Sequence, residues 1–597
     1  YFLSIAIVLS FSRRDDGSDS PGGFMGFLSR VFGIYITIHK SGHQQGESLR
    51  QPPPASGLNP DISGVILKSN PFVSIHVSTY NEKRVIDRLL TACTSFDYPN
   101  YEVIVADDSN DETVELLSRW ENHPMIKISH RNSRDGYKGG ALAQALKITD
   151  PRAKFIMIFD ADFIPYPDTI VQFLKYFQVS AGGNLNFDNT KGDNRNIDSI
   201  AAVQGYQWHM LNKSENWITR GVRTEYAGSY VIERSGAEIY SGLKQISGSV
   251  YMIRKDVLQK VGWGRSITED FELTLRLYEQ GYKVVYTPYI QAPAEAVSTI
   301  KRLIRQRMRW AEGHSFNIKK MFIPLLFGKW QSSSSGKAIF QQSVLTRTEK
   351  LELIYLAPYY LQAAFFIIGT LCWFMAEVIF QVRLPFWTEV WGWSLVATNL
   401  IALPLMNMIG LFMEETDEKD YLGLFSFIVL TYIVAPFQAY AAIKGFLEKE
   451  EGPWFRTPKT GRITDTLRPG RVRSFLQGIF GQPTPALNIV SPRAYPYALP
   501  ALTTSHNTFD SFKIVRKKSR WIGKTVLSLT IMLSVLLQTY APYIEVASVP
   551  LIHPASNGII VSPQQSIRDA KNPQQPQNNL QSNHSLSLPK LFSGINT

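Results

Sequence analysis

The segment FIMIFDAD, residues 155–162, decides the fold class of this chain. It is a short, almost wholly apolar run that ends in two closely spaced aspartates. Three similar runs precede it: FVSIHVSTY (72–80), YEVIVADD (101–108) and IKISHR (126–131). Helix-like stretches lie between the runs, at 82–95, 112–121 and 140–148. Buried strands that alternate with helices predict βαβ units, so we expect an α/β domain with a mainly parallel sheet.

Acidic residues stand where the second and fourth runs end, which is the edge where open α/β sheets bind ligands. Asp160 and Asp162 can hold one hard divalent cation together with phosphate oxygens, or can simply be solvated. Asp107 and Asp108 can cap a turn, hydrogen-bond a nucleobase or support the metal. Each pair alone is a weak signal.

A second group of polar motifs lies further along, where residues 267–288 predict a helix followed by a strand. Thr268 and the acids after it can cap that helix, or Asp270 can act as a general base. Residues 298–320 predict a basic amphipathic helix that carries QRMRWAEG (306–313). This helix can lie on an anionic membrane surface. It can also bind a diphosphate and a sugar, since Arg309 offers a bidentate phosphate grip, Gln306 a neutral donor and Trp310 an aromatic face.

The overall charge calls for an anionic partner. The 597 residues carry a net charge of +12 and a pI near 9.3, which fits a membrane surface, nucleic acid or a phosphorylated small molecule. We do not expect nucleic acid, because the cations cluster beside apolar segments and no nucleic-acid module is recognisable. Two cysteines, Cys93 and Cys372, make neither a disulfide framework nor a metal cluster.

Long apolar segments predict membrane spans. They lie at 353–380, 390–412, 422–443 and 521–544, and basic clusters at 456–473 and 513–524 should be cytosolic. Because Tyr1 stands first and 1–11 is apolar, we expect a fragment that begins inside a membrane helix. The expected division is 1–40 N-terminal membrane segment, 41–69 linker, 70–320 cytosolic catalytic domain, 321–450 transmembrane helices, 451–520 basic cytosolic segment, 521–545 C-terminal transmembrane helix and 555–597 disordered tail.

The order of the motifs is more specific than any one of them. YNE (80–82), DD (107–108), DAD (160–162), TED (268–270) and QRMRW (306–310), followed by membrane segments, resemble the membrane-embedded processive branch of the family 2 glycosyltransferases, which includes cellulose, mannan, chitin and hyaluronan synthases. GYKGGAL (136–142), IFDADF and VQGYQWHMLN (203–212) look most like mannan, glucomannan and bacterial cellulose synthase-like members. The resemblance implies a GT-A (Rossmann-like) nucleotide-sugar-binding domain embedded in an α-helical multi-pass membrane domain. A plasma membrane is expected before a Golgi membrane.

The resemblance also implies roles for individual residues. Tyr80, Glu82, Asp107 and Asp108 would hold the nucleoside of the donor, and Asp160 and Asp162 would hold Mg2+ or Mn2+ against its diphosphate. Lys138 would lie near the nucleotide, or is simply a turn lysine. Asp270, beside Glu269, would be the catalytic base. Gln306 and Arg309 would steady the pyrophosphate, and Trp310 would meet the acceptor sugar.

The function implied is inverting transfer of a hexose from a UDP-glucose or GDP-mannose type donor to the end of a growing β-linked polysaccharide, coupled to membrane translocation. Trp373, Trp387, Trp391 and Trp393 could line the glycan path, although an interfacial aromatic belt is the preferred interpretation. Two alternatives stay open: a non-processive transferase that acts on a membrane lipid, and a membrane-tethered protein that binds a nucleotide without turnover.

A last motif has two interpretations. PWFRTPKTGR (453–462) resembles the cytosolic gating loop of cellulose synthases, F-x-V-T-x-K, but lacks its valine. Phe455, Thr457 and Lys459 match the loop only loosely, so a plain basic segment next to the membrane is an equal expectation.

Overall fold

The computed structural model describes residues 2–11, 62, 65–180, 199–332, 338–382, 401–411, 413–414 and 420–465. Most of the expected 41–69 linker and the span at 521–544 lie outside this part. So do the basic cluster at 513–524, the tail at 555–597, most of the basic segment after 465, and Trp387, Trp391 and Trp393.

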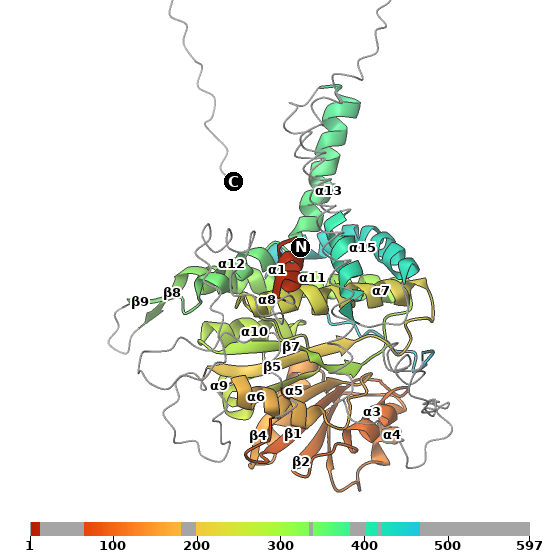
Figure 1. The fold of residues 1–597 in the computed structure, drawn as a ribbon, viewed down its shortest axis with the longest axis vertical. Coiled ribbons are helices and arrows are strands. Elements are labelled where there is room, and N and C mark those ends of the chain that lie inside the picture. Colours follow the sequence, from red (N-terminus) through yellow and green to blue (C-terminus); the bar gives the residue numbers. More distant parts are fainter. Residues whose placement is uncertain are drawn as a thin grey trace, which may run out of the picture. The chain divides into compact units, whose positions relative to one another are not determined.

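A seven-stranded sheet forms the centre of the fold (Figure 1). Its strands are β1 Phe72–Thr79, β2 Tyr101–Asp107, β3 Ile126–His130, β4 Ala153–Asp160, β5 Ile200–Trp208, β6 Tyr251–Arg254 and β7 Lys283–Pro293. Their order is β3-β2-β1-β4-β6-β5-β7. The pairs β1–β2, β1–β4, β2–β3 and β5–β7 are parallel, and only β6 runs antiparallel to both of its neighbours. The predicted α/β class with a mainly parallel sheet is confirmed.

Strand β4 shows why the sheet runs were almost continuously apolar. Phe155, Met157 and Phe159 point into one hydrophobic core, and Ile156 and Ile158 point into another. Since successive side chains of a strand point to opposite faces, both faces of the sheet are covered and neither can be polar.

Helices supply these two covers. They include α3 Ile86–Cys93, α4 Thr113–Ser118, α5 Tyr137–Ile148, α6 Thr169–Ser180, α9 Lys255–Val261 and α10 Glu269–Glu279. Leu89, Leu90 and Phe173 of α3 and α6 join the first core. Leu258 of α9 and Phe271 of α10 join the second.

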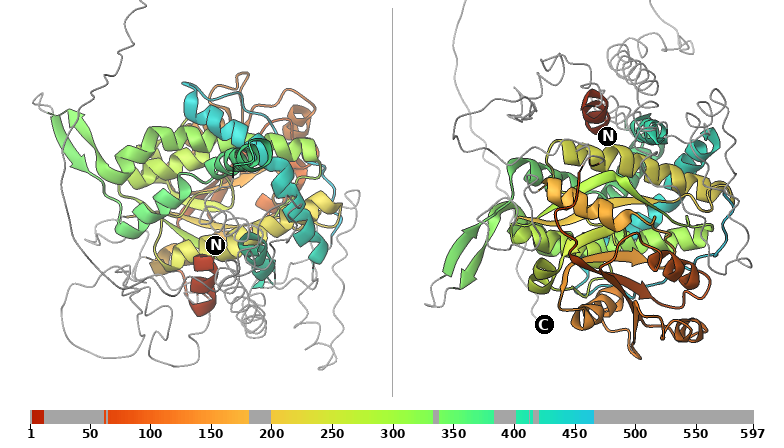
Figure 2. Two further views of the ribbon diagram at one scale, coloured as in Figure 1. Left: turned by 90° about the horizontal axis from the view of Figure 1, so that it is seen from above. Right: turned by 60° about the horizontal axis from the view of Figure 1, so that its bottom comes forward.

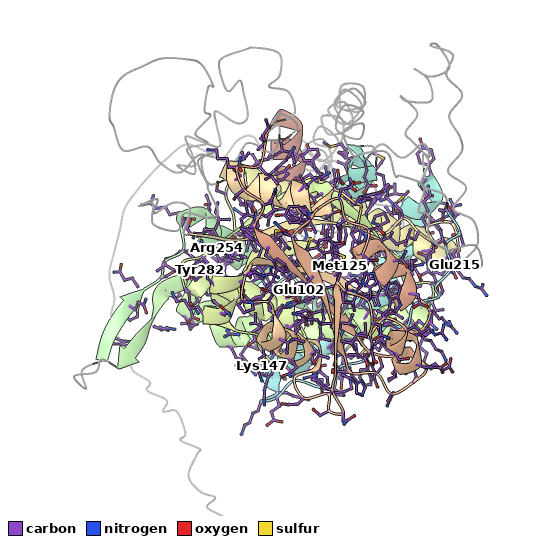
Figure 3. The ribbon with its side chains drawn as sticks, turned by 90° about the horizontal axis from the view of Figure 1, so that it is seen from below. Glu102, Met125, Lys147, Glu215, Arg254 and Tyr282 are labelled. Carbon is purple, nitrogen blue, oxygen red and sulfur yellow. The ribbon has the colours of Figure 1, made fainter. Side chains whose placement is uncertain are left out.

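The chain reverses its direction across the sheet between β1 and β4. From β1 it builds outward through β2 and β3, and it then returns to place β4 on the other side of β1. In the parallel register Thr79 lies beside Asp107 and Ser78 beside Asp160, so the carboxyl ends of all three strands meet. Such a switch point is where open α/β sheets bind ligands. Glu102 and Met125, labelled in Figure 3, lie at the amino ends of β2 and β3 and therefore mark the opposite edge.

A layer of helices covers the carboxyl edge. It contains α7 Trp217–Ala227, the π-helical turn η2 Gly228–Glu233, α8 Arg234–Ile239 and α11 Ile300–Phe327. Helix α11 confirms the predicted basic helix and packs on α15 Tyr421–Leu447 (Figures 1 and 2). The contact is close, since a Cβ on Gly445 would lie 2.2 Å from the Glu312 carbonyl oxygen. Next in the chain come the hairpin β8 Gly328–Ser332 and β9 Ala338–Gln342, and then α12 Arg347–Leu356.

Two helices of the described part are long and apolar enough to cross a membrane: Leu361–Ile379, which is α13 Leu361–Phe374 continued by η3 Met375–Ile379, and α15. The span expected at 353–380 is shorter than predicted, because the chain turns at 357–360. Pro358 has no N–H to continue the helix of α12. A shorter apolar helix, Ile401–Leu411, lies in the span expected at 390–412, and α1 Phe2–Phe11 forms in the first apolar segment.

Candidate active site

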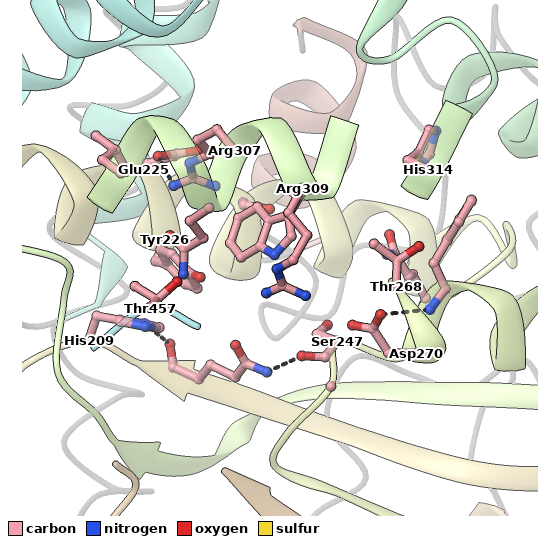
Figure 4. Close-up of a pocket in the computed structure, with 18 of the residues that line it drawn as sticks. His209, Glu225, Tyr226, Ser247, Thr268, Asp270, Arg307, Arg309, His314 and Thr457 are labelled. Carbon is pink, nitrogen blue, oxygen red and sulfur yellow. Dashed lines mark hydrogen bonds and ion pairs between the residues drawn. The ribbon is translucent and has the colours of Figure 1, made fainter. Parts of the chain in front are cut away.

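A cavity of about 560 Å³ opens at the carboxyl edge of the sheet. All of the predicted site residues except Asp107 line it. They come from segments far apart in the sequence: the ends of β1, β2 and β4, the first turns of α5 and α10, and the middle of α11. Figure 4 shows Arg309 and Asp270 pointing into this cavity from two sides.

The D-x-D carboxylates each hold a lysine. Lys138 donates to Asp160 Oδ1 at 2.6 Å, and Lys459 donates to Asp162 Oδ2 at 2.7 Å. Burial raises the pKa of Asp160 in spite of Lys138. Burial would also raise the pKa of Asp162, but Lys459 and other nearby cations outweigh it and lower that pKa. A nearby positive charge therefore stabilises the ionised form of both carboxylates.

These two carboxylates suit a hard divalent cation, which prefers oxygen ligands. In the described part of the chain no group of three or more histidines, cysteines, aspartates and glutamates could enclose a metal. A cation held by Asp160 and Asp162 would thus need further oxygen ligands from water or from substrate phosphates.

Asp270 lies in the first turn of α10. Its Oδ1 accepts a hydrogen bond from the Phe271 N–H at 2.9 Å. Burial, followed by repulsion from Glu269, raises the pKa of Asp270 to about 6, while Lys138 and Arg309 act in the opposite direction. A carboxylate with this pKa is mostly ionised at neutral pH and basic enough to accept a proton.

Lys138 connects the two acidic groups. Besides Asp160, it contacts Glu269 Oε1 at 3.3 Å and donates to the Gly248 carbonyl oxygen at 2.7 Å. Burial would lower the pKa of Lys138, but Asp160 and Glu269 raise it above its usual value, so the ammonium stays charged. Its contacts reach well beyond those of a turn lysine.

Thr268 occupies the N-cap position of α10, but its side chain does not cap the helix. Its hydroxyl instead accepts a hydrogen bond from Asn317 Nδ2 of α11 at 3.1 Å. A Cβ on Gly313 of α11 would lie only 2.5 Å from the same hydroxyl. The capping alternative does not hold for the Thr268 side chain, because Thr268 fastens α10 to α11, and this contact fixes Asp270 relative to the QRMRW motif.

On α11, Arg309 donates from Nη1 to the Ile267 carbonyl oxygen at 2.9 Å, and its buried Nε has no hydrogen-bond partner. A half-buried guanidinium with a free, buried donor is suited to an anionic ligand. Trp310 lies under the Arg307 guanidinium, 4.4 Å from the ring centre. Arg307 itself pairs with Glu225 of α7 at 2.6 Å, as Figure 4 shows.

The residues expected to hold the nucleoside differ in their positions. Tyr80 and Glu82 line the cavity, and so does Asp108, which is gripped by Arg131 at both carboxylate oxygens, at 2.7 and 2.6 Å. Asp107 does not line the cavity. Its oxygens accept hydrogen bonds from Thr79, the Ser109 N–H and His130, so the structure gives Asp107 a supporting place behind Asp108.

Segment 451–465 enters the cavity, which a plain basic segment beside the membrane would not do. Arg456 pairs with Glu82 at 3.1 Å, and Lys459 reaches Asp162 as described above. The Glu295 carboxylate fastens the segment further, because it accepts hydrogen bonds from the Thr460 and Gly461 N–H groups. The segment is therefore part of the cavity wall, and a gating role for Lys459 stays a prediction.

Several residues of this region were not predicted. Trp454 of segment 451–465 packs against Tyr137 and lies 4.8 Å from the guanidinium of Arg134, which itself stacks on Tyr80 at 3.5 Å. Arg134 and Glu295 belong to no motif, so only the fold reveals them. Trp454 and Arg456 lie inside the motif at 453–462, and their place between Pro453 and Thr457 is the sequence signal that could have indicated them.

The cavity continues from the acidic cluster toward the helical layer. Its lining there is rich in tyrosines: Tyr226, Tyr230, Tyr359, Tyr360 and Tyr432. Aromatic and hydroxyl groups suit sugar rings. Trp373, the one of the four tryptophans that the structure describes, is exposed and does not line the cavity.

Comparison with known proteins agrees with these motifs. Residues 70–313 match the family model described as "Glycosyltransferase like family 2". Relatives from Oryza sativa subsp. japonica include the probable glucomannan 4-beta-mannosyltransferase 3, which is 28% identical over 43% of this chain and 46% of its own length. Another is glucomannan 4-beta-mannosyltransferase 1, 25% identical over 68% of this chain and 73% of its own length. A solved mannosyltransferase from Pyrobaculum calidifontis, in complex with GDP-Man and Mn2+, is 19% identical and covers 75% of this chain and 100% of its own, with a TM-score of 0.41.

Proposed function

We propose, from the premise that residues 70–313 form a glycosyltransferase domain of family 2, that this enzyme transfers a hexose from a nucleotide sugar to a β-linked glycan. The observation that carries the proposal is the meeting of Asp160, Asp162, Asp270 and Arg309 in one cavity at the switch point of the sheet. Because the relatives are named mannosyltransferases, GDP-mannose is the first donor to test and UDP-glucose the second.

The proposed chemistry is a single displacement with inversion. Asp270 accepts the proton of an acceptor hydroxyl, and the hydroxyl oxygen forms a bond to the anomeric carbon of the donor. The bond between that carbon and the diphosphate breaks on the opposite face, and the nucleoside diphosphate leaves with the electron pair. An α-linked donor thus gives a β-linked product.

The other site residues bind and orient in this proposal. Arg309, with its unpartnered Nε, and Gln306 stabilise the growing charge of the leaving diphosphate. Tyr80, Glu82 and Asp108 hold the nucleoside, and Trp310 meets the acceptor sugar. Asp160 and Asp162 would hold Mg2+ or Mn2+, which when bound neutralises diphosphate charge. Lys138 keeps Glu269 ion-paired beside Asp270.

We further propose that the domain is of the GT-A type, faces the cytosol and belongs to a multi-pass membrane protein that passes its product outward. Two candidate spans and a cavity that reaches Tyr432 of α15 support this arrangement. A plasma membrane location is part of the same proposal. An acceptor on a membrane lipid is the alternative that the test must separate.

The test uses the purified full chain in nanodiscs with Mn2+ or Mg2+. Radiolabelled GDP-mannose and UDP-glucose are offered separately with a manno- or gluco-oligosaccharide, and products are divided into lipid-soluble, oligosaccharide and high-molecular-weight fractions. Label in the second or third fraction with one donor supports the proposal. Label in the lipid fraction alone would show that the acceptor is a lipid and not a glycan. Donor binding without any transfer would contradict the proposal.

A further inference from the structure

We propose that the β8–β9 hairpin and the outer face of α12 form a lipid-binding surface that rests on anionic headgroups of the membrane. This surface comprises the exposed side chains of Ile323, Phe327, Trp330, Phe340, Leu351 and Ile354, and it rests on the membrane span proposed above for α13. It follows from the unusual polarity of α12 and from the exposed aromatic side chains of the hairpin.

Helix α12 turns two glutamates inward and two large apolar residues outward. Its acidic residues Glu349 and Glu352 are buried, at 3% and 6% exposure, while Leu351 and Ile354 are 51% and 48% exposed. The two carboxylates are satisfied inside the protein: Lys283 donates to Glu349 at 2.6 Å, and the Tyr240 hydroxyl donates to Glu352. An amphipathic helix normally turns its apolar side inward. In α12 only Leu353 follows this rule, at 0% exposure, whereas Leu351 and Ile354 form an outward apolar strip that is favourable only if something apolar covers it.

The hairpin continues the same exposed apolar surface. Trp330 of β8 and Phe340 of β9 are paired across the two strands, with ring centres 5.2 Å apart, and they are 70% and 42% exposed. Phe327, the last residue of α11, is 60% exposed. Figures 1 and 2 show the hairpin extending beyond the helices that it connects. Tryptophan and phenylalanine exposed together are typical of side chains that insert at a membrane interface.

Chain connectivity brings the surface to the bilayer. Helix α13, the start of a candidate span, begins at Leu361, seven residues after Ile354. Seven residues reach at most about 25 Å, so α12 cannot lie far from a membrane that α13 crosses. A protein partner could cover an apolar face elsewhere, but a face this close to a span meets the lipid first.

The exposed charges on these elements are positive. Lys320 near the end of α11 and Arg347 at the start of α12 are both exposed. Lys329 of β8 pairs with Glu279 of α10 at 2.7 Å, which fixes the base of the hairpin to the catalytic domain. Cations beside inserted aromatic rings favour anionic headgroups. The attachment at Glu279 means that the surface would also orient the domain on the membrane.

The test measures the depth of Trp330 in the full chain held in nanodiscs. The difference in emission between the wild type and Trp330→Phe isolates the signal of Trp330. Lipids brominated near the headgroup should quench that signal more than lipids brominated near the acyl-chain end. Trp120→Phe is the matched control, since Trp120 follows α4 and donates to Asp87, and its signal should not be quenched by either lipid.

A second arm tests the headgroup. Phosphatidylglycerol added to phosphatidylcholine should increase the quenching of Trp330, and a Lys320→Gln/Arg347→Gln variant should lose that increase. If the quenching of Trp330 is the same with and without phosphatidylglycerol, the headgroup part of the proposal is wrong. If Trp330 emits at short wavelength but no brominated lipid quenches it, a second copy or another protein covers the hairpin, and the lipid surface is wrong.

Discussion

The pKa of Asp270 gives a prediction about the pH dependence of transfer. A base must be ionised to accept a proton, and burial with the neighbouring Glu269 raises this pKa from 3.8 to about 6. At pH 7 about nine-tenths of such a carboxylate is ionised, and at pH 5 about one-tenth. We therefore expect kcat/KM to fall roughly tenfold between pH 7 and pH 5. With an unshifted pKa of 3.8, the rate would barely change over this range.

Variants of Lys138 test the charge that opposes this upward shift of the Asp270 pKa. This cation favours the ionised form of Asp270, so Lys138→Met should move the midpoint of the pH profile upward as well as slow the reaction. Lys138→Arg keeps the charge and should leave the midpoint near that of the wild type. The assay measures initial rates of labelled transfer from pH 4.5 to 8 at low donor concentration. A flat profile, or a midpoint that moves down in Lys138→Met, would refute the assignment of Asp270 as the base.

Two further variants test the metal site and the packing. Lys459→Gln removes the ammonium that neutralises Asp162, so Mn2+ measured by electron paramagnetic resonance should bind more tightly, by at least about tenfold; unchanged or weaker binding would show that Asp162 does not serve the metal. Gly139→Ala would place a Cβ 2.4 Å from the Gly264 carbonyl oxygen and should lower the free energy of unfolding by about 1–3 kcal/mol. Gly369→Ala has no atom within 4 Å and is the matched control; equal unfolding curves for both variants would contradict the close approach of α5 to Gly264.

The sequence was most informative where a signal is local. The first four strands form within a few residues of their predicted bounds, because a strand that is covered on both faces must be apolar along its length. Strand β6 has only four residues, which is too short for its apolar run to be recognised as a strand. Its antiparallel direction is not visible in the sequence either. The break before α13 depends on Pro358, a local signal that the apolar composition of 353–380 concealed.

Contacts between distant segments were harder to predict. Arg456 and Glu82 are 374 positions apart, and nothing in either neighbourhood indicates that they meet. Asp107 and Asp108 are equivalent in the sequence. Only the register of β1 and β2, which places Thr79 beside Asp107, turns one carboxylate inward and leaves the other at the cavity. The motifs therefore indicated which residues carry the chemistry better than which residues hold them in place.

The most direct test of the central claim separates donor binding from transfer in Asp270→Asn. The variant keeps the size of the side chain and removes its basicity, and binding and single-turnover transfer are both measured in nanodiscs with Mn2+. If Asp270 is the base, the variant binds the nucleotide sugar about as tightly as the wild type and transfers at least about a hundredfold more slowly. Transfer at the wild-type rate would show that another group accepts the proton and that the proposed active site is wrong.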